Sequence, residues 1–203
     1  MVSRPFARFK QNRVAHTAYE PMLVLASASP RRHELLLAAR IDHVVRPAHV
    51  PETRRPDEPP QAYVMRIARE KARAVQSSPS EIVLGADTVV VCLEGIVLGK
   101  PASTEDAAHM LRSLSGRGHR VLTGISLCRG ERFIGDVAET LVWFDEIGND
   151  DIEAYLATGE PMDKAGAYGI QGYASRFVRR IEGCYHNVVG LPVSLVWRHL
   201  KSI

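Results

Sequence analysis

The run Ile82–Val91, IVLGADTVVV, constrains the fold of this chain more than any other segment. Eight of its ten residues are apolar or small, which is typical of a β-strand that is covered on both faces. Asp87 lies in the middle of the run, with Thr88 beside it. An ionised carboxylate in such a strand costs about 3–5 kcal/mol when it lacks a partner. The rest of the sequence must therefore supply a cation, or a reason for a raised pKa of Asp87.

Three structural explanations for Asp87 are open. Its carboxylate could cap a strand end, it could form a buried salt bridge to a lysine such as Lys71, or Gly85 could break the run before it forms a strand. A functional explanation instead combines Asp87 with a metal ion, because hard divalent cations bind carboxylate oxygens.

Strand-like and helix-like patterns alternate from Met22 onward, with no internal repeat. Such alternation favours an α/β fold in which a mixed β-sheet carries helices on both faces. Strands are predicted at 22–27, 82–91, 120–128, 132–144 and 176–181, and helices at 30–40, 61–76, 103–114, 150–157 and from 191. A short return through IVLGKP follows the second strand, and residues 159–172 form a Gly-rich loop.

The composition excludes several classes of protein. With 203 residues, 45% of them apolar and 24% charged, the chain is expected to form one domain, or one core with two lobes. Three widely spaced cysteines and eight histidines without metal-ligand spacing suggest neither a disulfide framework nor a zinc site, so we expect a reducing, cytoplasmic context. A net charge of +3 does not argue for nucleic-acid binding, and no apolar run approaches the roughly 18 residues of a membrane span.

Residues 1–21 differ in kind from the rest of the chain. They carry four Lys or Arg residues, one acid, and no apolar core of a secretory signal. An organelle transit segment is one interpretation, and an upstream start codon or a disordered tail is the one we favour. We therefore expect a basic N-terminal tail at 1–21 and a single domain at 22–203.

The segment SASPRRHELL places two cations where a helix disfavours them. Ser29 suits the N-cap and Pro30 the first helical position, so Arg31 and Arg32 fall in the first turn, where the helix dipole repels positive charge. Free backbone N–H groups and paired guanidinium groups there would form a good phosphate site. The plain alternative is a solvated basic turn.

Lys71 falls on the apolar side of a predicted helix. In QAYVMRIAREKARAVQ, a period of 100° per residue places it at the centre of the apolar stripe formed by Val64, Ile67, Ala68 and Val75. A lysine that snorkels from a helix edge is the ordinary explanation. The central position instead predicts an ammonium group that points into a polar cleft.

Cations near a buried acid point to phosphate chemistry. Lys100, in LGKP, and Lys164, in PMDKAGAYGIQG, lie in loops whose glycines would let backbone N–H groups approach a ligand. A divalent ion and basic residues neutralise phosphate charge, while a carboxylate orients or deprotonates water. Neither a Walker A loop nor a GxGxxG motif is present.

Seven segments in register resemble the Maf family of nucleoside triphosphate pyrophosphatases over about residues 23–200. They are LASASPRRHELL, YVMRIAREKA, GADTVV, LGKP, LSGRGHRVLTGISL, DKAGAYGIQG and YHNVVGLP. The resemblance implies an elongated α/β fold related to the inosine triphosphate pyrophosphatases, with two lobes around a central cleft. It also implies a cytoplasmic homodimer that uses a divalent cation, Mg²⁺ or Mn²⁺, to hydrolyse a nucleoside triphosphate to the monophosphate and pyrophosphate.

The resemblance also implies roles for individual residues. Asp87 matches the general base, and Glu52, in HVPET, matches an acidic residue near the metal, so that both become candidate metal ligands. Substrate binding is assigned to Ser27, Arg31, Arg32, Lys71, Thr88, Lys100, Lys164 and Gln171. Three of these, Arg31, Thr88 and Gln171, match the subgroup that acts on dTTP and UTP rather than on 7-methyl-GTP. A glutamine offers a donor and an acceptor to a uracil or thymine edge, although backbone groups of the Gly-rich loop could read the base instead.

Two rival functions remain at the level of sequence. One is a nucleotide-binding regulator of septum formation that has no significant turnover, and the other is a phosphomonoesterase. A binding protein needs cations but no inward carboxylate, and no nucleophile motif of a phosphomonoesterase is evident. The product released from a nucleotide would discriminate among the three.

Overall fold

The computed structural model describes residues 22–203. The basic segment 1–21 lies outside the described residues, so the prediction of an N-terminal tail stays a prediction. Within residues 22–203, no helix is both long and apolar enough to cross a bilayer.

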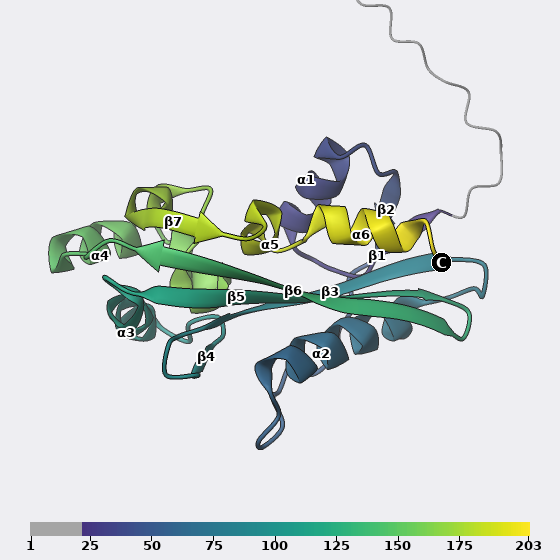
Figure 1. The fold of residues 1–203 in the computed structure, drawn as a ribbon, viewed down its shortest axis with the longest axis horizontal. Helices are drawn as coiled ribbons and strands as arrows, with labels where there is room; N and C mark the ends of the chain where they lie inside the picture. The colour runs from purple at the N-terminus through teal and green to yellow at the C-terminus, as the bar shows by residue number, and fades with distance from the viewer. Residues whose placement is uncertain (1–21) are drawn as a thin grey trace, which may run out of the picture.

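A mixed seven-stranded sheet forms the long axis of the molecule (Figure 1). Its order is β2-β1-β3-β5-β6-β7, and β4 pairs with the far end of β3. The short strands β1 and β2 are parallel to each other and β1 is parallel to β3, whereas the remaining pairs are antiparallel. The strands are β1 (Leu23–Leu25), β2 (His43–Val45), β3 (Ile82–Val91), β4 (Val97–Leu98), β5 (Gly118–Arg129), β6 (Arg132–Phe144) and β7 (Val178–Glu182).

Helices cover both faces of this sheet, as the sequence predicts. Helix α2 packs on one face against β3 and β5, and α5 and α6 pack on the other face against β5 and β6 (Figure 1). Their bounds are α1 (Pro30–Ala38), α2 (Pro60–Val75), α3 (Thr104–Leu114), α4 (Asn149–Ala157), α5 (Tyr185–Val189) and α6 (Val193–Leu200). The fold is an elongated α/β fold, and its main core includes the large buried side chains Leu25, Leu84, Leu111, Phe144 and Tyr155.

Side chains cap the start of helix α3. Ser103 is the N-cap, and its hydroxyl accepts a hydrogen bond from the backbone N–H of Asp106 at 3.2 Å. The Asp106 carboxylate accepts in turn from the backbone N–H of Ala102 at 2.9 Å. Side chains thus satisfy one donor of the first helical turn and the N–H of the residue that precedes the N-cap.

We expect Ser103→Ala to lower the free energy of unfolding by about 1 kcal/mol, because the N-cap acceptor is lost. Urea denaturation measures the change. Ser194→Ala, at an exposed position of α6, is the matched control and should have a smaller effect. An unchanged midpoint in Ser103→Ala would show that water replaces the cap at no cost.

Short elements are where the structure departs from the sequence prediction. Strand β2, helix α5 and the three-residue extent of β1 were not predicted, and β7 begins at Val178 rather than at 176. Segments of three to five residues carry too few positions for a period to be visible. The predicted Gly-rich loop contains 3₁₀ turns, among them η1 (Glu160–Asp163) and η2 (Ala165–Ala167).

Because β1 is much shorter than β3, it pairs with only one end of β3. β1 ends at Leu25, which pairs with Leu84, and β4 pairs only with Val90 and Val91 at the other end of β3. The edge of β3 between these two partners has no strand beside it among residues 22–203. Asp87 lies within this gap, so the sheet itself provides the opening that the buried carboxylate needs.

Candidate active site

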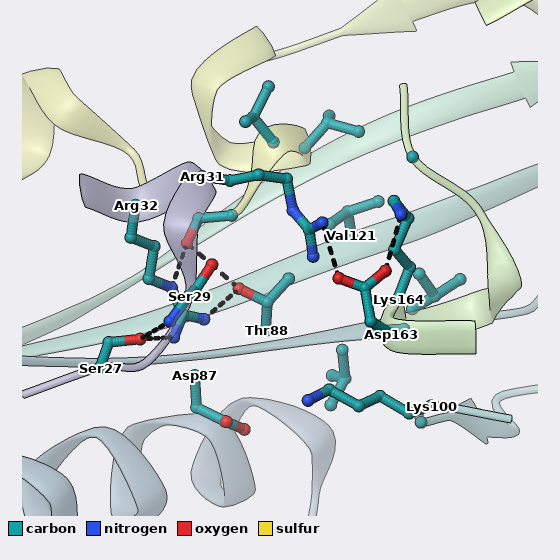
Figure 2. Close-up of a pocket in the computed structure, with 18 of the residues that line it drawn as sticks. Ser27, Ser29, Arg31, Arg32, Asp87, Thr88, Lys100, Val121, Asp163 and Lys164 are labelled. Carbon is teal, nitrogen blue, oxygen red and sulfur yellow. Dashed lines mark hydrogen bonds and ion pairs between the residues drawn. The ribbon is translucent and has the colours of Figure 1, made fainter. Parts of the chain in front are cut away.

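A cleft of about 630 Å³ lies at this gap in the sheet. Its walls come from the β1–α1 segment, the inner face of α2, the middle of β3, and the loops around η1 and η2 (Figure 2). A cleft of this volume is the usual size for a small-molecule site. Every residue that the sequence assigned to the site lines it, namely Ser27, Arg31, Arg32, Glu52, Lys71, Asp87, Thr88, Lys100, Lys164 and Gln171.

Asp87 faces α2, where Lys71 meets it. Lys71 is buried, as its place in the apolar stripe predicts, and its Nζ lies 2.8 Å from Asp87 Oδ1. The same Nζ lies 2.8 Å from Oε1 of Glu52, whose side chain is half-exposed at the cleft. One ammonium group thus bridges two carboxylates, one buried and one reached by solvent.

The environment of Asp87 decides among the structural explanations. Asp87 lies in the interior of β3, so the strand-end and broken-strand explanations are wrong, and the buried salt bridge to Lys71 is present. Burial raises the pKa of Asp87, while the charges of Lys71 and Arg32 act to lower it. Burial is the larger effect, so the group is a stronger base than an exposed aspartate.

Arg32 is committed to protein acceptors. Its Nε donates to the carbonyl of Gly190, its Nη1 to Ser27 Oγ and to the carbonyl of Ala86, and its Nη2 to Thr88 Oγ1, at 2.8 to 3.0 Å. The Ala86 carbonyl belongs to the open edge of β3, so the guanidinium group takes the place of a strand partner. Arg31 and Arg32 both line the cleft, and the prediction that their guanidinium groups together bind phosphate stays a prediction.

Arg31, in contrast to Arg32, lies at the mouth of the cleft. Its Nη1 lies 3.1 Å from Oδ2 of Asp163, and the other carboxylate oxygen of Asp163 lies 2.7 Å from Lys164 Nζ (Figure 2). A carboxylate thus lies between two of the predicted phosphate-binding cations. Asp163 was missed by the sequence reasoning, although it stands next to Lys164 in the segment DKAGAYG. A polyphosphate would compete with it for both cations.

Two glycines of the loop, Gly169 and Gly172, lie against protein side chains. A Cβ at Gly169 would lie 2.5 Å from Lys164 Cε, and one at Gly172 would lie 2.1 Å from Oε1 of Glu160. Protein side chains therefore occupy the space beside both glycines, whereas a Cβ at Gly99, in LGKP, would meet nothing within 4 Å. Gln171 lies between Gly169 and Gly172 and is exposed to the cleft.

A sequence profile of the family described as Maf-like protein matches residues 22–203. The chain belongs to the Maf-like protein family. Two curated relatives are both named dTTP/UTP pyrophosphatase. One, from Koribacter versatilis (strain Ellin345), is 53% identical over 180 residues, which are 88% of this chain and 93% of the relative. The other, from Vibrio parahaemolyticus serotype O3:K6, is 50% identical over 173 residues, or 84% of this chain and 91% of the relative.

The fold is shared more widely than the Maf-like sequence. The structure of a HAM1 protein from Coxiella burnetii superposes with a TM-score of 0.50 at 14% identity, covering 91% of this Maf-like chain and all of the other. At that identity the likeness concerns the fold alone. It agrees with the prediction of an elongated mixed sheet with helices on both faces.

The acidic residues of this Maf-like protein suit a hard divalent cation. Within residues 22–203, no three His, Cys, Asp or Glu side chains are grouped as a metal cluster. Asp87 and Glu52 nevertheless converge on one cationic group, Lys71 Nζ, at 2.8 Å each. Mg²⁺ is commonly bound through one or two carboxylates together with phosphate oxygens of the substrate. Asp87 and Glu52 are thus ligands of the type that suits the divalent cation implied by the resemblance.

Proposed function

We propose that this chain hydrolyses dTTP and UTP to the nucleoside monophosphate and pyrophosphate. The observation that carries the proposal is the buried Asp87 in a cleft lined by cations, in a chain that is about half identical to relatives named dTTP/UTP pyrophosphatase. Such a cleft suits a substrate that brings several negative charges and a bond that water must break.

The cationic residues bind the triphosphate in this proposal. Lys100 extends into the cleft, and Arg31 and Lys164 would exchange the Asp163 carboxylate for phosphate oxygens (Figure 2). The first turn of α1 adds backbone N–H groups, which favour anions. Arg32 would act mainly by holding Ser27 and Thr88 in place, since its donors already have protein acceptors.

Asp87 acts as the general base. It would accept a proton from a water molecule while the water oxygen forms a bond to the α-phosphorus. The bond between the α-phosphorus and the oxygen that bridges the α- and β-phosphates would break in the same step. Pyrophosphate is then the leaving group. Burial raises the pKa of Asp87 and so makes the carboxylate more basic, while the ammonium group of Lys71 at 2.8 Å favours its ionised form.

Glu52 and Asp87 would hold a Mg²⁺ or Mn²⁺ ion together with the substrate. The ion would supply neutralisation of the phosphate charge. Lys71 would then share the two carboxylates with the ion, and its contacts at 2.8 Å keep both side chains oriented toward one point.

Gln171 and Thr88 would contribute to base selection, with Arg31 at the cleft mouth. The amide of Gln171 can both donate to and accept from a uracil or thymine edge. Its exposed position in the cleft leaves that amide accessible to a nucleotide. The proposal also includes a cytoplasmic homodimer that binds neither nucleic acid nor membrane.

A nucleotide panel tests the proposed function. The purified chain is incubated with dTTP, UTP, CTP, GTP and 7-methyl-GTP, with and without Mg²⁺ or Mn²⁺, and pyrophosphate and phosphate are measured separately. We expect pyrophosphate from dTTP and UTP in the presence of the ion. Release of inorganic phosphate alone would favour a phosphomonoesterase, and nucleotide binding without any product would favour the regulatory alternative.

A further inference from the structure

One carboxylate ties down both sides of the loop that carries Gln171. On the C-terminal side, the backbone N–H of Tyr173 donates to Oε2 of Glu160 at 3.1 Å. On the N-terminal side, the N–H of Gly169 donates to the hydroxyl of Tyr155 at 3.2 Å, and that hydroxyl donates to Oε1 of Glu160 at 3.2 Å. The residues on either side of Gln171 are thus linked to Glu160, directly or through Tyr155.

The packing of the loop depends on the same side chain. The Glu160 carboxylate occupies the space that a Cβ at Gly172 would need, at 2.1 to 2.5 Å. The chain can approach Glu160 this closely only because glycine has no side chain. The Glu160 carboxylate therefore constrains the path of the loop backbone next to Gln171.

The anchor of this network lies in the core. Tyr155 is fully buried and stacks on the ring of Tyr173, with centroids 5.3 Å apart and an angle of 15° between the planes. Burial raises the pKa of Tyr155, so its hydroxyl stays protonated and can donate to Glu160. The buried Tyr155 thus holds the loop at Gly169. Gln171, two residues further along the loop, is exposed to the cleft.

We propose that Glu160 is a positioning residue that sets the selectivity for the base through Gln171, an inference that rests on the proposed function. Glu160 lies beneath the loop, where its carboxylate meets the N–H of Tyr173 and the hydroxyl of Tyr155. Selection by hydrogen bonds requires the amide of Gln171 to be held in place before the nucleotide arrives. Loosening the two ties lets the amide move. Lys164 Nζ donates to the main-chain carbonyl of Glu160 and not to its carboxylate, so a change confined to the side chain leaves this contact of the cation in place.

The test is Glu160→Gln, which keeps the size of the side chain but turns one of its two acceptors into a donor. We expect the preference for UTP over CTP, as a ratio of kcat/KM values, to fall about tenfold, the factor typical of one net hydrogen bond. The loss should appear mainly as a higher KM for UTP. Inhibition by inorganic triphosphate, which has no base, should be unchanged. Glu153→Gln, at an exposed position on α4, is the matched control.

Tyr155→Phe provides a second variant in case Glu160→Gln folds poorly. It keeps the stacked ring and removes only the hydroxyl between Gly169 and Glu160, so the same loss of preference is expected. An unchanged UTP to CTP ratio in both variants would overturn the inference. Weaker inhibition by triphosphate, or an equal loss for both nucleotides, would also overturn it, because it would show a general structural role. If the wild-type chain released no pyrophosphate from UTP, the proposed function would fail and the inference with it.

Discussion

Asp87→Asn is expected to lower kcat for UTP by about 10²–10⁴-fold, the usual range for the loss of a general base. Asparagine has nearly the same shape as aspartate, and its carbonyl oxygen can still accept from Lys71 Nζ, which lies 2.8 Å from Asp87 Oδ1. The fold and the cationic side of the cleft should therefore remain. Steady-state release of pyrophosphate measures kcat, and circular dichroism checks that the variant is folded.

The pH profile separates a base from a residue that only fills space. Only ionised Asp87 can accept a proton, so wild-type kcat should decrease as pH falls through the pKa of this group, which burial raises. This decrease of kcat at low pH should be absent from the Asp87→Asn variant. A loss that higher Mg²⁺ concentrations restore would instead identify Asp87 as a metal ligand alone. Near-normal turnover would contradict the general-base assignment, and Asp42→Asn, an exposed substitution, is the control.

The long elements and the inward lysine could be predicted from sequence because each has a period. A run of ten residues, eight of them apolar or small, predicted β3, and an apolar stripe over about three turns predicted α2 and the burial of Lys71. Strands β1 and β2, with three residues each, have no such signal. The opening beside Asp87 depends on where β1 ends, so the sequence could predict a buried acid but not the gap that exposes it.

The candidate site could be predicted as a set of residues but not as a set of contacts. Charge and position predicted that Arg31 and Arg32 lie near an anion site. Neighbouring residues on a helix point about 100° apart, however, and the two side chains meet different partners, the Asp163 carboxylate and the open edge of β3. Which partner each one meets depends on segments that lie 54 and 132 residues away along the chain, strand β3 and η1. A pattern within ten residues contains no information on that choice.

Lys71→Met is expected to lower the free energy of unfolding by about 3 kcal/mol at neutral pH. Methionine fills a similar volume, but it leaves the buried Asp87 carboxylate without its ammonium partner, which is costly in the interior. Glu52 is half-exposed and keeps its hydration, so the loss comes mainly from Asp87. Urea denaturation measures it. Arg73→Met, on the same helix, breaks an exposed ion pair to Glu131 and should cost less than about 1 kcal/mol.

The stability lost in Lys71→Met should depend on pH. Without Lys71, burial raises the pKa of Asp87 further above its unfolded value, so the folded variant binds a proton more tightly than the unfolded chain. The penalty is absent below the unfolded pKa and grows as pH rises toward the folded pKa. The difference from wild type should therefore be smaller at pH 4 than at pH 7.

Adding Asp87→Asn to Lys71→Met removes the charge itself and should restore most of the lost stability at neutral pH. If the double variant were as unstable as Lys71→Met, the loss would come from packing around residue 71 and not from the unpaired carboxylate.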